Sequence, residues 1–201
     1  MKEKITESFG DKILYQMCRD YHEHTDNEIV AGKIWLIGRS YAAAIERGAG
    51  SQIEKGEDFY RVKVAPKICD SPIDEWIKSV KKIKRLTREN ITDSLRCHKK
   101  VMDLFAEIAG GTTKRSLASK YLHFHAPDAF FIYDSRAKDE VKRRLGGRQK
   151  RPESLLTDCD LDYQIFCDQC LRYRDQMENK MGHQATVTPR HLDSELLNFQ
   201  L

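Results

Sequence analysis

The chain has 201 residues, a length that predicts one compact domain. Its residues are 40% hydrophobic and 33% charged; this composition excludes intrinsic disorder, and no apolar run is long enough to cross a bilayer. The net charge of +4 hides a basic middle, because residues 58–151 carry +11, residues 1–57 carry −2 and residues 152–201 carry −5. Such an asymmetry favours a polyanionic partner.

Hydrophobic periodicity predicts helices along nearly the whole chain. The first covers about residues 13–21. A longer one begins at Asp26 or Asn27, continues to Ile45 and ends at a break over residues 48–50. Residues 59–64 alternate between apolar and polar side chains, which predicts one short strand or extended arm ahead of Pro66.

The second half of the chain continues the helical pattern. Ser71 and Pro72 are expected to cap and open a helix. Further helices are predicted over about residues 92–109, 116–124, 134–145, 153–158 and 161–180, and from Thr188-Pro189 onward. The sequence therefore predicts an all-α, compact multi-helix fold over residues 1–201, either as one domain or as two helical lobes divided near residues 110–116.

The most informative stretch is SLASKYLHFHAPDAFFIYDSRA, residues 116–137. Lys120 lies in an apolar helical segment, and burial tends to lower the pKa of a lysine, which makes its amine a candidate nucleophile. Asp134 follows a proline turn and a hydrophobic run, at the start of the next predicted helix. A carboxylate held by backbone N–H groups there stays ionised and can stabilise a developing cation.

This order of lysine, short helix, proline, hydrophobic run and capping aspartate resembles the catalytic core of helix-hairpin-helix DNA glycosylases, especially those of the 8-oxoguanine type. In that family the lysine attacks the sugar of a flipped, damaged nucleotide and the aspartate assists, so the resemblance assigns these roles to Lys120 and Asp134. The family's glycine-rich hairpin is missing, because residues 114–119 read KRSLAS, and the interval from lysine to aspartate is shorter than usual.

The resemblance implies a DNA base-excision repair glycosylase, with or without lyase activity, that acts on a flipped base. Aromatic candidates for the base pocket are Tyr121, His123, His125 and Tyr133. Candidates for contacts with the DNA backbone are Lys114, Arg115, Arg136, Lys138, Lys142 and Arg143. The alternative is a non-catalytic all-α module that binds nucleic acid or protein.

No metal or other cofactor is expected, and the location expected is cytoplasmic. The two His-x-His pairs, at residues 22–24 and 123–125, suit chelation poorly, because residues two apart on a helix point about 200° apart. Cys159, Cys167 and Cys170 are explained as small side chains buried along a helix. The N-terminal residues lack the apolar core of a signal peptide, so the thiols are expected to be free.

Overall fold

The computed structural model describes residues 8–50, 57–147, 155–182 and 186–197. Over these residues the fold is all-α, as the sequence predicts, with nine α-helices, one π-helical turn and no strand. The helices are α1 (Phe9–Asp20), α2 (Asn27–Ser40), α3 (Ala65–Cys69), α4 (Ile73–Val80), α5 (Ile91–Ile108), α6 (Arg115–His125), α7 (Ser135–Arg144), α8 (Leu161–Met181) and α9 (Pro189–Leu196).

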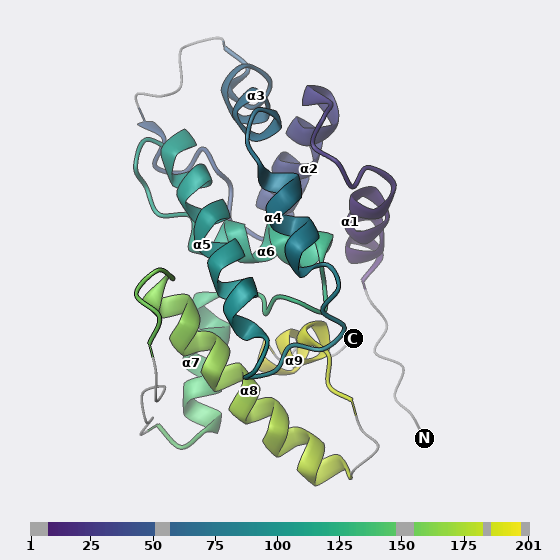
Figure 1. Ribbon diagram of the computed structural model, residues 1–201, viewed down its shortest axis with the longest axis vertical. Coiled ribbons are helices and arrows are strands. Elements are labelled where there is room, and N and C mark those ends of the chain that lie inside the picture. Colours follow the sequence, from purple (N-terminus) through teal and green to yellow (C-terminus); the bar gives the residue numbers. More distant parts are fainter. Residues whose placement is uncertain (1–7, 51–56, 148–154, 183–185, 198–201) are drawn as a thin grey trace.

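The helices pack around two hydrophobic clusters. Figure 1 shows α1 to α4 and α6 above α7 to α9, with the long helix α5 running between the two groups. The first cluster contains buried side chains from residues 14–130, and the second contains those from 131–196 together with Leu86 and Leu95. Phe130 and Phe131 belong to different clusters, so the extended segment after α6 joins them. Both sides of the predicted lobe boundary, residues 110–116, belong to the first cluster.

Helix α6 is the central element of the fold. Every side chain from Leu117 to His125 is buried, and the helix packs against α1, α2 and α5. A helix that is covered on all sides carries its polar residues into the interior, where each of them needs a partner. This position explains why a lysine of α6 is buried.

The prediction of a strand or extended arm at residues 59–64 is wrong. Tyr60–Val64 form a π-helical turn that continues directly into α3. Phe59, Val64 and Ile68 are buried on one side of this helical segment, so the alternation in the sequence follows a helical surface. The wider turn precedes Pro66, whose ring would press on the carbonyl four residues earlier in a regular α-helix.

The second helix also ends earlier than predicted. Asp26 caps α2 as expected, but the helix ends at Ser40, where Ala42 adopts a left-handed conformation with φ of 52°. The amide of Ala42 donates to the carbonyl of Arg39 and that of Ala43 to the carbonyl of Gly38, which is the Schellman pattern of helix termination. A Cβ on Gly38 would lie 3.1 Å from Cα of Ala44, closer than most side chains pack, so a glycine favours this close turn.

Replacing Ala42 with glycine should stabilise the protein. A left-handed conformation costs a residue with a Cβ about 1 kcal/mol, and glycine adopts it freely. We expect Ala42→Gly to raise the free energy of unfolding by roughly 0.5–1 kcal/mol, measured by urea denaturation. The matched change at Ala43, which has no positive φ, should destabilise instead, and equal effects of the two changes would contradict this account.

Two smaller differences concern the helices predicted near residues 71 and 153. Ser71 does not cap α4, because its hydroxyl donates to the carbonyl of Ile68 and Pro72 occupies the capping position. Of the helix predicted at residues 153–158, residues 155–158 are not helical, and the rest lie outside the described residues. Thr188 caps α9 and Asp134 caps α7, as predicted.

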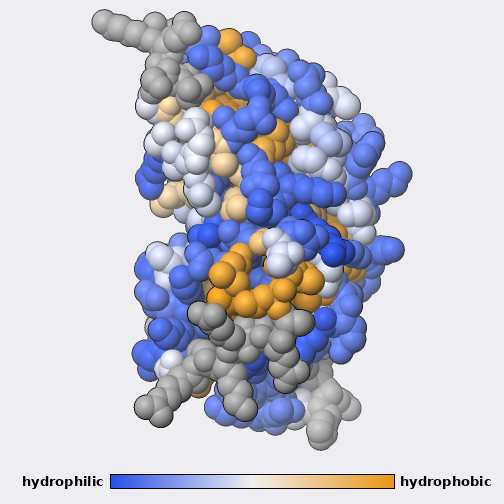
Figure 2. Space-filling view, turned by 60° about the vertical axis from the view of Figure 1, so that its left-hand side comes forward, coloured by the Kyte–Doolittle hydropathy of each residue, from blue (hydrophilic) through white to orange (hydrophobic). Residues whose placement is uncertain are grey.

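The surface is largely polar. Figure 2 shows one face on which hydrophilic side chains predominate and hydrophobic ones gather in the middle. Among the described residues, no helix combines the length and the apolar character needed to cross a membrane. All six cysteines are free thiols, as expected from the sequence.

Candidate functional site

Lys120 lies in the interior with its amine at the wall of a pocket. Its side chain is 2% exposed, and Nζ donates to the carbonyl of Tyr41 at 3.1 Å and to Oγ of Ser116 at 2.9 Å. The Tyr41 carbonyl is placed there by the turn that ends α2. Burial lowers the pKa of Lys120, and the charge of Asp134 opposes this shift in part.

Asp134 is the third partner of this amine. Its Oδ2 lies 3.4 Å from Nζ of Lys120, and its Oδ1 accepts the backbone N–H of Arg136 at 2.9 Å, which caps α7. Burial alone would raise the pKa of Asp134, but the charge of Lys120 and the bond from Arg136 outweigh it, so the pKa lies below its usual value. The carboxylate is therefore ionised beside the amine, as the sequence predicts for a helix cap.

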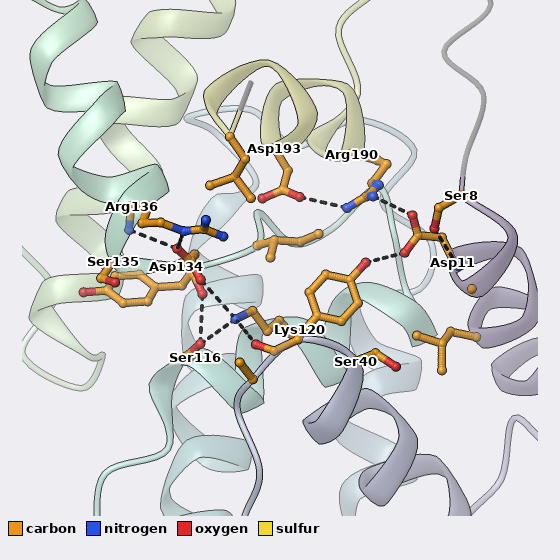
Figure 3. A pocket seen from close by; sticks show the side chains of 17 residues that line it. Ser8, Asp11, Ser40, Ser116, Lys120, Asp134, Ser135, Arg136, Arg190 and Asp193 are labelled. Carbon is orange, nitrogen blue, oxygen red and sulfur yellow. Dashed lines mark hydrogen bonds and ion pairs between the residues drawn. The ribbon is translucent and has the colours of Figure 1, made fainter. Parts of the chain in front are cut away.

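Both side chains open into one pocket of about 700 Å³. Figure 3 shows Lys120 and Ser116 from α6, Asp134 and Arg136 at the start of α7, and two charged residues of α9 on the opposite wall. Leu14, Ile132 and Leu197 also line the pocket. A volume of this size accommodates a small molecule or a single nucleoside.

The wall opposite Lys120 is a chain of four polar residues. Arg190 lies between two carboxylates: its guanidinium donates to Asp11 at 2.5 Å and to Asp193 at 2.8 Å. Asp11 also accepts the hydroxyl of Tyr41 at 2.5 Å, so this network holds the residue whose carbonyl binds Lys120. Burial raises the pKa of Asp193 to about 6, and the positive charge of Arg190 opposes that shift.

Sequence reasoning missed this second wall. Asp11, Arg190 and Asp193 are distant from residues 116–137 in the chain, and Arg190 lies 179 residues after Asp11. One local signal exists, because Asp193 follows Leu192 on the side of α9 that carries the buried leucines 192 and 196. A charged residue on the apolar side of an amphipathic helix needs a buried partner.

The four base-pocket candidates lie in two different places. Only Tyr133 lines the pocket. The other three are buried in the core: Tyr121 bonds to His24 at 2.8 Å, His123 bonds to Tyr15 at 2.5 Å, and His125 packs against Tyr121. They contribute to packing, and none of these three contacts the pocket.

Of the six candidates for contacts with the DNA backbone, some are buried or paired and others are exposed. Lys114 is buried and donates to the carbonyl of Arg47, and Arg115 pairs with Asp160 at 2.5 Å. Arg136 lines the pocket with a side chain that is 72% exposed. Along α7, Lys142 is exposed, Lys138 is half-buried, and Arg143 pairs with Glu140 at 2.7 Å. The structure therefore leaves α7 and its Arg136 as the basic surface next to Lys120.

In the described part of the chain, no three His, Cys, Asp or Glu side chains lie close enough together to hold a metal ion. Comparisons of the chain with protein families, curated proteins and solved structures gave no match. The chemistry of the pocket is thus the basis for assigning a function.

Proposed function

We propose that the chain is a DNA base-excision enzyme related to the helix-hairpin-helix glycosylases, which acts on a damaged nucleotide flipped out of the duplex. Lys120 is its amine nucleophile and Asp134 the carboxylate that assists. The observation that carries the proposal is the pair itself: a buried lysine amine lies 3.4 Å from an ionised carboxylate, and both line one pocket. An amine in such surroundings loses its proton more easily than one in water.

The chemistry follows from these positions. Burial lowers the pKa of Lys120, so its ammonium loses a proton to water, which frees the nitrogen lone pair and leaves Asp134 charged. The amine then attacks C1′ of the nucleotide, the bond from C1′ to the base breaks, and the base leaves with the bonding electrons and gains a proton. The negative charge of Asp134 also stabilises the positive charge that develops at C1′ in the transition state.

The basic surface next to the pocket supports DNA as the partner. Arg136 and Lys142 are exposed on α7, which begins at Asp134. Cations placed beside the reacting nucleotide would neutralise its flanking phosphates and hold the strand in register. The missing glycine-rich hairpin makes this α7 surface the main candidate for the grip on the backbone.

Trapping with borohydride tests the proposal. Mixed with DNA that contains an abasic site, the protein should form an imine, because the Lys120 amine adds to the C1′ aldehyde and water leaves. Hydride from borohydride reduces the imine to a stable amine, which appears as a protein–DNA adduct on a denaturing gel. We expect the wild-type protein to give this adduct and Lys120→Ala to lose it.

Two further variants make the result specific. Lys120→Arg keeps the positive charge in the pocket but should give no adduct, since the guanidinium is not a nucleophile at neutral pH. Lys99→Ala removes a lysine that pairs with Asp103 on α5, and it should trap like the wild type. A wild-type protein that neither traps abasic DNA nor excises any base from a panel of lesions would favour the non-catalytic binding module.

A further inference from the structure

Only one of the two carboxylate oxygens of Asp193 has a hydrogen-bond partner among the described residues. Its Oδ2 accepts from Arg190 at 2.8 Å, but its Oδ1 is buried and has no hydrogen-bond partner among the described residues. The residue is 3% exposed and lines the pocket. In Figure 3 this second oxygen points away from Arg190, toward the side of the pocket where Asp134 and Arg136 lie.

A buried carboxylate oxygen without a donor is costly. An unsatisfied buried acceptor loses its hydrogen bonds to water and gains none in the protein, so most buried polar groups in native proteins have a partner. The groups that face Asp193 do not remove this cost, because Arg190 is shared with Asp11, and Lys120 is held by Tyr41, Ser116 and Asp134. A ligand that brings an N–H into the pocket would supply the missing donor.

We propose that Asp193 is a specificity-determining residue, whose free oxygen accepts a hydrogen bond from a ring N–H of the nucleobase bound beside Lys120. The identity of the ligand as a nucleobase rests on the proposed function; the need for a donor rests on Asp193 alone. The pocket would then prefer bases with a lactam-type ring N–H over bases that present a bare or alkylated ring nitrogen at the same place.

In this proposal the apolar and the charged residues of the pocket contact different parts of the nucleotide. Leu14, Ile132 and Leu197 offer apolar contact to a flat ring, and Lys120 with Asp134 faces the sugar. Arg190 fixes the orientation of Asp193 by holding its other oxygen, and Asp11 fixes Arg190 in turn. A carboxylate held in this way is preorganised, so binding loses little side-chain entropy.

A matched pair of free nucleosides tests the inference. 2′-Deoxyinosine carries the ring N–H, and 1-methyl-2′-deoxyinosine replaces that hydrogen with a methyl group. Dissociation constants are measured by NMR titration of the full chain at pH 7.5. We expect the wild type to bind 2′-deoxyinosine about tenfold more tightly, the difference typical of one hydrogen bond to a charged group.

Asp193→Asn preserves the size of the side chain but allows its amide oxygen to bond to Arg190 and its NH₂ group to face the ligand. The preference for 2′-deoxyinosine should then shrink to less than about twofold, since two donors would face each other. Asp103→Asn is the matched control on the surface of α5, and it should keep the wild-type preference. The comparison of the two nucleosides on the wild type is a test in itself, so a poorly folded variant does not remove it.

Equal affinities of the wild type for the two nucleosides, or no binding of either, would overturn the role of Asp193. No bond breaks in this titration, and the abasic DNA used for trapping contains no base. Binding with the expected preference but without trapping would therefore contradict the catalytic role of Lys120 and leave Asp193 as a recognition residue. Trapping without the preference would support the catalytic role of Lys120 and contradict the recognition role of Asp193.

Discussion

Arg190→Met should destabilise the protein by about 3–5 kcal/mol at neutral pH, the cost of removing one partner from a buried ion pair. Arg190 holds Asp11 at 2.5 Å and Asp193 at 2.8 Å, and all three side chains are largely buried. Methionine replaces the aliphatic part of the arginine side chain but leaves two carboxylates without their cation. The free energy of unfolding from urea denaturation at pH 7.5 measures the loss.

The control for this prediction is Arg88→Met. Arg88 pairs with Asp175 at 2.8 Å on the surface, where both side chains are well exposed. Water and salt screen such a pair, so its loss should cost less than about 1 kcal/mol. Adding Asp193→Asn to Arg190→Met should recover part of the lost stability, because one of the unpaired charges is removed. Equal effects of the Arg190 and Arg88 changes would contradict the role given to this network.

Lowering the pH from 7.5 to 5 should remove about 6 kcal/mol of stability. Burial lowers the pKa of His24, His98 and His123 to about 4 in the folded protein, and it lowers the pKa of His125 as well. A histidine in the unfolded chain has a pKa near 6.5, so between pH 6.5 and 4 the unfolded state binds more protons. Stability therefore falls as the pH falls through this window, by up to about 2 kcal/mol for each histidine at pH 5.

Asp193 acts in the opposite direction in the same window. Burial raises its pKa to about 6, so the folded state binds this proton more tightly than the unfolded state does. Its protonation returns roughly 1–2 kcal/mol to the folded state by pH 5, and the expected net loss allows for this. Urea denaturation at pH 7.5 and at pH 5 measures the difference directly.

Histidine substitutions identify the source of the pH dependence. His123→Gln removes one buried imidazole and should reduce the loss between pH 7.5 and 5 by about 2 kcal/mol, even if it lowers stability at both pH values. His22→Gln, which changes an exposed side chain, is the matched surface control. A protein equally stable at pH 7.5 and 5 would show that the buried histidines do not govern its acid unfolding.

Local signals predicted most of the fold. The capping residues Asp26, Asp134 and Thr188 place the starts of α2, α7 and α9 correctly, because a side chain that accepts from the next turn acts within four residues. The failures occur where the local signal is ambiguous. Six alternating residues fit a strand and a helical surface equally well. The left-handed turn at Ala42 has no sequence signal, because alanine does not favour a positive φ.

The candidate site divides in the same way. Lys120 and Asp134 lie 14 residues apart within one stretch, so their pairing follows from a helix, a turn and a cap. Tyr121 and His123 belong to the same stretch, but tertiary packing places them in the core. Asp11 of α1 and Arg190 of α9 meet only in the folded structure, and no pattern along the chain encodes that contact.

The distance in sequence between the walls of the pocket determines when the pocket can form. Arg190 is synthesised 179 residues after Asp11, so during translation the pocket closes only after α9 has emerged and docked. Until then, the wall of the pocket that carries Arg190 and Asp193 is missing. Lys120, the proposed nucleophile, is thus fully enclosed only when the fold is complete, and the rate at which its amine reacts with an amine-specific reagent would report how far folding has progressed.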